Sequence, residues 1–294
     1  ENGITRSLHF QANIQHYRPL DYFWRRPICE RQNLSVLRRV IRTFRPDLVF
    51  VWGMWNLSHE LAYWAEQWMT PARVAYAIAD YWPLEPDMHG VYWRLPARHR
   101  AVEAVKNLAR KWILPRLDRS AAKYRPKFQN VACVSHYVLE KLLQANAVPA
   151  HSRVIYNGID PEPFARCQRS CRRDGSLRLL YFGSISQNKG VHTAIEALGA
   201  LRRRGLADGL ELLIVGAGHP DYMASLRQLV AESGLKDCVA WRGQVRRSQV
   251  PAILGMTDVF LFTSIYEEPI ARTVMEAMAA GVAVIGTAVG GQRE

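Results

Sequence analysis

The feature that most limits the fold of this chain is an alternation of short apolar runs with helix-like segments, which occurs twice along its 294 residues. In the first half the apolar runs are Asp47–Val51, Val74–Ala79 and Asn130–Val134, each followed by a segment with apolar residues at helical spacing. Strands joined by helical crossovers run parallel. The alternation therefore predicts an α/β chain whose parallel sheets are covered by helices.

The same alternation restarts after Arg166–Ser176, a basic, polar segment almost without aliphatic residues. This composition is typical of a linker. We expect one domain over residues 1–170 and a second over residues 171–294, since 294 residues with 49% hydrophobic side chains suffice for two cores. The strands expected in the second domain are Leu177–Phe182, Leu210–Val215, Cys238–Trp241, Asp258–Phe262 and Val282–Gly286.

The chain is strongly basic, with 39 Lys and Arg against 26 Asp and Glu. Residues 91–128 carry 11 of the cations and only two carboxylates, Glu103 and Asp118. Such a concentration favours an anionic partner, which is a phosphate-bearing ligand, an acidic membrane surface or nucleic acid. No nucleic-acid-binding motif accompanies it, so we expect no nucleic-acid partner.

A basic amphipathic helix is predicted within this segment, from about Ala97 to Leu114. Its apolar residues share one face: Val102, Val105, Ala109, Trp112 and Ile113. Its cations lie off that face: Arg100, Lys106, Arg110 and Lys111. We interpret the apolar face as packing on the core. Two interpretations of the cations stay open, namely docking of residues 94–127 on an anionic lipid surface and a solvated basic face.

Several classes of protein are disfavoured. The five cysteines are odd in number and scattered, and Cys167 and Cys171 match no zinc spacing, so neither a disulfide framework nor a zinc site is expected. There is no signal peptide and no apolar run of the length that spans a bilayer. We expect a cytoplasmic protein, with the inner face of the membrane as a peripheral location.

A candidate phosphate-binding loop follows the strand Leu177–Phe182 and begins with Gly183 and Ser184. A glycine after a strand lets the backbone approach a ligand closely, and Lys189 adds positive charge before the next helix, whose N-terminus favours anions. An ordinary strand–loop–helix turn with a solvated lysine fits the same pattern.

Two carboxylates, Glu268 and Glu276, mark a second candidate element of the site. Pro269 suits the first position of a helix, so we place Glu268 at a helix mouth and Glu276 about two turns inside. Three main-chain amides would then point outward for phosphate oxygens: those of Ile270, Ala271 and Arg272. The two carboxylates would accept hydrogen bonds from sugar hydroxyls. Alternatively, Glu268 only stabilises the helix dipole and Glu276 is solvated.

Residues 177–294 resemble the C-terminal domain of the retaining glycosyltransferase family 4, which has the GT-B fold of two Rossmann-like domains. YFGSISQNKGVHTAIEAL is similar to its first strand, phosphate loop and helix, and LELLIVGAGHP, WRGQV and DVFLFTS follow in the family's order. Glu268 and Glu276 match its signature Glu pair. Its Gly-Gly-x-x-Glu element is matched by Gly290, Gly291 and Glu294. Residues 45–160 resemble the N-terminal domain, and the resemblance implies a chain truncated at both ends.

By this resemblance Glu276 would hold the ribose hydroxyls of a nucleotide-diphosphate-sugar donor and Glu268 would hold the donor sugar. Lys189 would bind the diphosphate and stabilise its charge as the glycosidic bond breaks. The loop from Gly243 to Val245 would lie against the base, and Asp80 would lie on the acceptor side. The implied reaction transfers the sugar to a glycan or lipid-linked acceptor with retention of configuration. It implies no metal and no cofactor, and a role in surface polysaccharide or glycoconjugate biosynthesis.

The chain departs from the family pattern at three places. Ser184 stands where relatives carry an Arg, for which Arg272 is a candidate replacement, and Ala79 stands where many carry a His. Ile270-Ala271 replaces the usual Phe-Gly. These departures keep open a non-catalytic nucleotide-sugar-binding relative. A basic membrane- or nucleic-acid-binding protein also stays open, and so does a nucleotide-sugar epimerase, against which the Glu pair counts.

Overall fold

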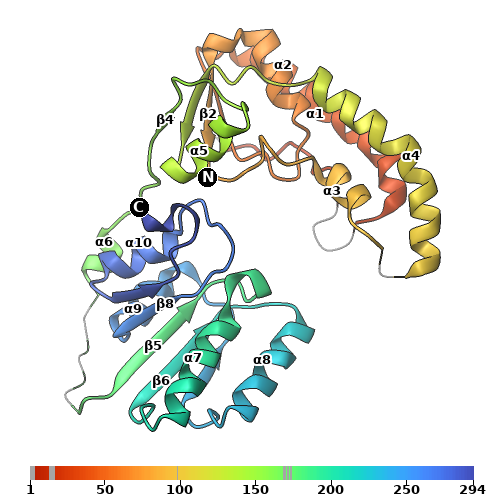
Figure 1. Ribbon diagram of the computed structural model, residues 1–294. Helices are drawn as coiled ribbons and strands as arrows, with labels where there is room; N and C mark the ends of the chain where they lie inside the picture. Colours follow the sequence, from red (N-terminus) through yellow and green to blue (C-terminus); the bar gives the residue numbers. More distant parts are fainter. Residues whose placement is uncertain (1–3, 13–16, 98, 168–169, 171, 173) are drawn as a thin grey trace. The chain divides into compact units, whose positions relative to one another are not determined.

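The computed structural model describes residues 4–12, 17–97, 99–167, 170, 172 and 174–294, which form two compact units, Glu1–Tyr156 and Asn157–Glu294 (Figure 1). The division falls before the boundary predicted at residue 170. The reason is that α6 (Glu162–Ala165) packs on α9 (Val250–Gly255) and α10 (Arg272–Ala279) of the second unit and buries Phe164 in its core. Four residues of the predicted linker lie outside the described residues: Gln168, Arg169, Cys171 and Arg173.

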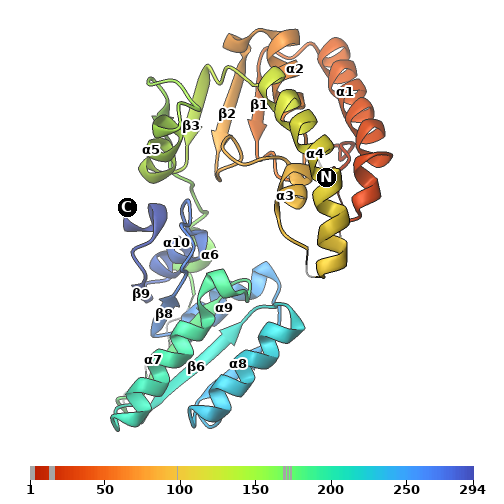
Figure 2. The ribbon, with the colours of Figure 1, turned by 45° about the vertical axis from the view of Figure 1, so that its right-hand side comes forward.

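The first unit is built on a four-stranded parallel sheet in the order β1-β2-β3-β4, of which Figure 2 labels β1, β2 and β3. Its strands are β1 (Val49–Trp52), β2 (Val74–Ile78), β3 (Asn130–Cys133) and β4 (Arg153–Val154). Its helices are α1 (Arg25–Phe44), α2 (Glu60–Met69), α3 (Met88–Arg94), α4 (Arg100–Lys123) and α5 (His136–Gln144). The parallel sheet with helices confirms the predicted class, whereas α1 and α3 have no counterpart in the prediction.

One buried carboxylate ties three parts of this unit together. Glu66 of α2 is 1% exposed and accepts hydrogen bonds from the Tyr76 hydroxyl, at 2.8 Å, and from the main-chain amides of Lys127 and Phe128. Tyr76 lies on β2, and the two amides belong to the segment that leads into β3. All of these donors belong to the same unit, and they supply the hydrogen bonds that a buried carboxylate requires.

The prediction that α4 packs its apolar face on the core is wrong for most of that face. Val102, Val105 and Trp112 are 51%, 73% and 66% exposed, and only Ile113 is buried. The helix instead packs through the side that carries Lys106, whose Nζ donates to the Leu95 carbonyl at 2.7 Å. Contacts with α3 and the segment after it, rather than apolar periodicity, therefore set which side of α4 faces inward. No helix in the described part of the chain combines the length and apolar composition needed to cross a membrane.

The second unit contains a five-stranded parallel sheet in the order β7-β6-β5-β8-β9. Its strands are β5 (Leu177–Phe182), β6 (Leu210–Val215), β7 (Val239–Arg242), β8 (Val259–Phe262) and β9 (Ala283–Gly286). Its longer helices are α7 (Val191–Arg203), α8 (Pro220–Glu232), α9 (Val250–Gly255) and α10 (Arg272–Ala279). Residues alternate along β5 between two cores: Leu180 lies in one and Tyr181 in the other.

The strand order has a direct consequence for ligand binding. From β5 the chain runs outward through β6 and β7, then returns to the other side of β5 and continues through β8 and β9. The connections after β5 and β8 therefore leave the sheet in opposite directions. In open parallel sheets such a switch point leaves a crevice at the carboxyl ends of the two strands, where ligands bind.

Candidate functional site

The loops after β5 and β8 are fastened to one another at this switch point. The amides of Ile265 and Tyr266 both donate to the Asn188 carbonyl, at 2.9 and 3.1 Å. Gly190 follows Lys189 with φ +66°, and a Cβ added there would lie 1.8 Å from the Thr263 carbonyl oxygen. Only glycine fits so close an approach at a positive φ. These contacts, which we call the clamp, bring the loop that carries Lys189 against the loop that carries Glu268.

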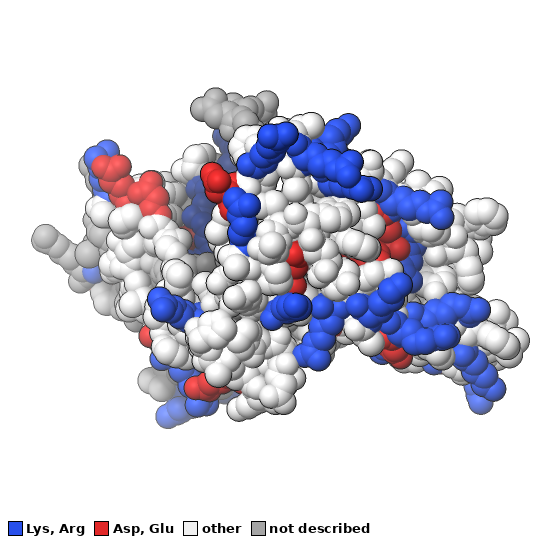
Figure 3. All heavy atoms as spheres, turned by 90° about the horizontal axis from the view of Figure 1, so that it is seen from above, with Lys and Arg blue, Asp and Glu red and all other residues white. Residues whose placement is uncertain are grey.

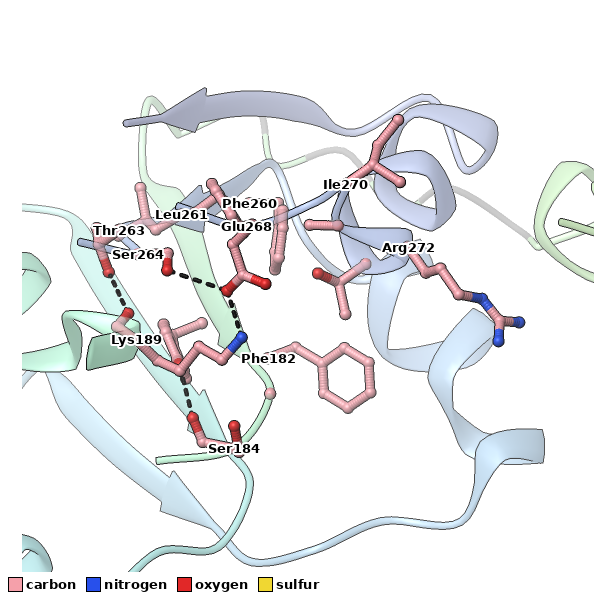
Figure 4. A pocket seen from close by; sticks show the side chains of 15 residues that line it. Phe182, Ser184, Lys189, Phe260, Leu261, Thr263, Ser264, Glu268, Ile270 and Arg272 are labelled. Carbon is pink, nitrogen blue, oxygen red and sulfur yellow. Dashed lines mark hydrogen bonds and ion pairs between the residues drawn. The ribbon is translucent and has the colours of Figure 1, made fainter. Parts of the chain in front are cut away.

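A cavity of ≈ 320 Å³ opens between these loops (Figure 4). Its lining includes Gly183, Ser184 and Lys189 from the first loop, together with Glu268 and the segment Ile270–Thr273 from the second. The Lys189 ammonium forms an ion pair with Glu268 Oε1 inside the cavity. The same oxygen accepts a hydrogen bond from the Ser264 hydroxyl at 3.0 Å. The cavity therefore presents a lysine ammonium paired with a carboxylate, and the Ser264 hydroxyl also holds that carboxylate.

The helix α10 begins later than predicted. It starts at Arg272, so Pro269 is not its first residue, and Glu268 lies in an extended loop before it. The cause lies in the last turn, η5 (Gly290–Arg293), which contacts that loop: the Gly291 amide donates to the Glu268 carbonyl at 2.9 Å. The Ala271 amide donates to Gln292 Oε1 at 3.0 Å. The prediction of a free amide at Ala271 is therefore wrong.

Glu276 lies on α10 with its side chain 1% exposed and does not line the cavity. Arg247 Nη1 lies 2.7 Å from Glu276 Oε1 and forms an ion pair with it. No described residue makes a hydrogen bond of good geometry to either oxygen of this carboxylate. A buried carboxylate without such bonds is costly, and a binding role is one way in which the cost is offset.

The other predicted residues are spread more widely. Ser184 and Arg272 are exposed, and the Arg272 guanidinium points away from the Lys189–Glu268 pair (Figure 4). Gly243 and Val245 lie in the loop after β7 that leads to Arg247. Gly290 and Gly291 are buried in η5, and Glu294 ends the chain.

Asp80 belongs to the first unit and follows β2. Its Oδ1 accepts a hydrogen bond from the Trp82 amide at 3.2 Å. Burial raises the pKa of the Asp80 carboxyl above its ordinary value, and the Trp82 hydrogen bond opposes that shift. In the same unit, burial also raises the pKa values of Glu60 and Glu85, and the charge of Asp80 adds to the shift of Glu85. Carboxyls with such pKa values are typical of functional sites as well as of ordinary packing.

Sequence reasoning missed Ser264, Gln292 and Arg247. Ser264 and Gln292 lie beside the motifs that drew attention, four residues before Glu268 and one after Gly291, but neither residue type is distinctive alone. Arg247 is separated from Glu276 by almost thirty residues, and nothing in the spacing connects the two.

Two family models together match most of the chain. "Glycosyltransferase Family 4" matches residues 7–163, which is more than half of the chain, and "Glycosyl transferases group 1" matches residues 168–294. These two segments correspond closely to the two structural units.

Curated relatives match with about 30% identity. A GDP-mannose-dependent alpha-(1-6)-phosphatidylinositol monomannoside mannosyltransferase of Mycobacterium tuberculosis is 30% identical over 177 residues, which are 56% of this chain and 45% of the relative. The amylovoran biosynthesis glycosyltransferase AmsK of Erwinia amylovora is 30% identical over 159 residues, 52% of this chain and 38% of the relative. The chain thus spans about half the length of the curated relatives it matches, or less.

Solved structures share the fold. A glycosyltransferase of Rickettsia africae superimposes with a TM-score of 0.65 at 19% identity, covering 97% of this chain and 66% of that one. Anabaena HepE in complex with UDP gives a TM-score of 0.61 at 21% identity, covering 88% and 65%. Together with the family matches and the two parallel-sheet units, these likenesses confirm the predicted fold class. The chain belongs to glycosyltransferase family 4 and has the GT-B fold.

Proposed function

We propose that this chain carries the donor site of a retaining glycosyltransferase that moves a sugar from a nucleotide diphosphate to a glycan or lipid-linked acceptor. The observation that carries the proposal is the contact of Lys189 with Glu268 in the cavity at the switch point of the second unit. A single ligand that brings both a diphosphate and sugar hydroxyls suits this pair. The names of the relatives, among them a GDP-mannose-dependent enzyme and a structure with UDP, support a nucleotide-sugar donor.

Each side chain then has a role that its chemistry suits. Lys189 exchanges its contact with Glu268 for the donor diphosphate and stabilises the negative charge that develops as the glycosidic bond breaks. Glu268 is released to accept hydrogen bonds from hydroxyls of the donor sugar. Glu276 accepts the ribose hydroxyls. These roles require the clamp between the two loops, because a shift of about 1 Å in a site of this kind costs activity.

The reaction that we propose needs no metal and no protein nucleophile. The acceptor oxygen bonds to the anomeric carbon as the bond from that carbon to the diphosphate oxygen breaks. The acceptor's proton passes to the departing phosphate on the same face, so the configuration is retained. Asp80 is proposed to act on the acceptor side, where a carboxylate can accept a hydrogen bond from an acceptor hydroxyl.

A calorimetric titration of the chain with UDP, GDP and ADP, and with their common sugar conjugates, tests the donor site. We expect one nucleotide to bind, the Glu276→Ala variant to lose that binding, and Glu268→Gln to lose the added affinity of the sugar conjugate. Glu267→Gln, which alters the exposed neighbouring carboxylate, is the matched control and should bind as the parent does. A folded chain that binds none of these ligands contradicts the proposal.

A second candidate function is favoured by Ser184 and Ala79, which replace a cation and a histidine of the family pattern. On this view the chain binds a nucleotide-sugar without transferring it. Donor turnover distinguishes the two: binding without release of the nucleotide, with acceptors from lipid-linked and free glycans, would establish the second candidate.

We further propose that α4 places the first unit on an anionic lipid surface. Val102, Val105, Leu108 and Trp112 lie along one side of the helix and are between 51% and 73% exposed. Exposed cations accompany them: Arg100, Lys111, Arg116, Arg119 and Lys123. Seen from above in Figure 3, Lys and Arg outnumber Asp and Glu, with uncharged surface between them. An apolar stripe within a basic surface is typical of helices that lie in the membrane interface.

Sedimentation with vesicles tests this docking. The chain should bind vesicles of phosphatidylcholine with phosphatidylglycerol, bind pure phosphatidylcholine at least tenfold more weakly, and lose binding in high salt. Val105→Glu with Trp112→Glu should abolish binding. Leu206→Glu alters a comparably exposed apolar residue of the second unit and should not. Equal binding to both kinds of vesicle would rule out the anionic surface.

A further inference from the structure

Arg247 stands out because it provides the counter-charge for a carboxylate that is almost fully buried. Its side chain is 60% exposed, whereas that of Glu276 is 1% exposed, and the two are 2.7 Å apart. Arg247 opens the short turn η4 (Arg247–Gln249) between β7 and α9, while Glu276 lies on α10. The guanidinium carbon also lies 6.0 Å from the Phe164 ring of α6. The Arg247 guanidinium, which belongs to η4, therefore lies near side chains of both α10 and α6.

The pair leaves acceptor capacity on the carboxylate. The 2.7 Å contact joins Arg247 Nη1 to Oε1, and no described residue makes a hydrogen bond of good geometry to Oε2. Each carboxylate oxygen can accept two hydrogen bonds, so the contact with Arg247 does not exhaust even Oε1. Its pairing with Arg247 therefore leaves the Glu276 carboxylate able to accept further hydrogen bonds.

We infer that Arg247 is a positioning residue for the ribose end of the donor site: it holds the Glu276 carboxylate in the orientation that accepts the ribose hydroxyls. The inference rests on the proposed function, in which Glu276 binds ribose. Without Arg247 the carboxylate loses the ion pair that the structure shows for it, and proteins avoid an unpaired buried charge by reorienting or neutralising the group. Arg247 thereby acts on the sugar of the nucleotide through Glu276.

The test compares each nucleotide with its 2′-deoxy counterpart, because only the ribose hydroxyls report on Glu276. Calorimetry with UDP and dUDP, and with GDP and dGDP, should show about tenfold tighter binding of the ribonucleotide that the chain accepts, as one hydrogen bond to a charged group implies. In Arg247→Ala this ratio should fall below about threefold. Glu276→Gln should lower it similarly, and Arg247→Ala should add little in that background.

A matched control and a second variant keep the test decisive. Arg246→Ala removes the adjacent exposed arginine, whose main-chain amide bonds Gln249, and should leave the ratio unchanged. Arg247→Gln keeps most of the side-chain volume without the charge and replaces the Ala variant if that fails to fold. An unchanged ratio, or tighter ribonucleotide binding, in the Arg247 variants overturns the inference. Failure of every nucleotide to bind the parent chain instead overturns the proposed function as well.

Discussion

The two units handle their charged side chains in different ways. In the second unit Lys189 and Glu268 meet in a cavity, and the nearly inaccessible Glu276 is matched by Arg247. In the first unit five of the seven cations of α4 face solvent beside exposed apolar residues. A buried charge is retained only when partners compensate for its lost hydration, whereas an exposed one needs none. The difference supports a small charged ligand for the second unit and an extended surface partner for the first.

The same difference extends to the backbone. At the site of the second unit, main-chain bonds join the loops after β5 and β8, and η5 fastens the segment before α10. Hydrogen bonds between segments far apart in the sequence hold side chains at fixed separations, which is what a catalytic site requires. The exposed apolar stripe on α4 lies on a single helix, so the spacing of its residues along the chain is enough to place them on one side.

The largest effect should come from Lys189→Ala. Removal of one group that stabilises developing charge lowers turnover by about 100-fold or more. The variant also leaves Glu268, which is 9% exposed, with Ser264 as its remaining side-chain partner. Release of the nucleotide from the donor identified by titration measures the change. Lys236→Ala removes an exposed lysine of the same unit and should have no effect. Turnover of the Lys189 variant within threefold of the parent would exclude its role.

Gly190→Ala should break the clamp on which the site depends. The alanine would have to keep a positive φ, and its Cβ would collide with the Thr263 carbonyl. We therefore expect a loss of about 3 kcal/mol in the stability of the second unit. Gly205→Ala is the control, because Gly205 has φ +68° with no atom within 4 Å of the added Cβ. It should cost only the conformational term of about 1 kcal/mol. Thermal unfolding followed by circular dichroism compares the two. Equal losses would mean that the close approach is not rigid.

Within α4, two adjacent residues test the contrast between packing and display. Ile113→Ala should destabilise the first unit by about 2–5 kcal/mol, because Ile113 packs on Trp93 and Leu117. Trp112→Ala should change stability by about 0.5 kcal/mol or less, since Trp112 is 66% exposed. Urea unfolding followed by tryptophan fluorescence reports on this unit, which holds eight of the nine tryptophans. A large loss for Trp112→Ala would show that its ring is packed.

The sequence predicted these regions unequally for a physical reason. The bounds of β5 and β6 agree with the structure residue for residue, because a buried parallel strand is a continuous apolar run between turn signals. The helix α1 was missed because its cations interrupt the apolar periodicity. For α4, periodicity identified a face, but only tertiary contacts decide whether a face has a partner. Helical spacing therefore cannot tell a packed Trp112 from an exposed one.

The site shows the same limit. Residues that act in one loop after one strand, such as Gly183 and Lys189, can be located by their order along the chain. The start of α10 could not, because the bonds from Gly291 and to Gln292 that delay it join segments some twenty residues apart. The pairing of Arg247 with Glu276 could not be predicted for the same reason, because only the fold brings the two residues together.

Among the proposed site residues, the smallest effect is expected from Asp80→Asn. Burial raises the pKa of Asp80 above its value in the unfolded chain, so the folded state binds protons more tightly there. Stability contributed by the protonated carboxyl is therefore present below the unfolded pKa of about 4 and is lost as the pH rises through the folded pKa.

The Asn variant has no charge to bury. Because Asp80 is only partly buried, solvent screens its charge, so the variant should equal the parent in acid and exceed it at pH 7 by at most about 1 kcal/mol. If Asp80 acts on the acceptor, as proposed, transfer should fall while stability rises, whereas a purely structural carboxyl would leave transfer unchanged. Parallel unfolding and turnover measurements between pH 4 and pH 8 separate these outcomes, and a variant less stable than the parent at pH 7 would show that the Trp82 hydrogen bond outweighs burial.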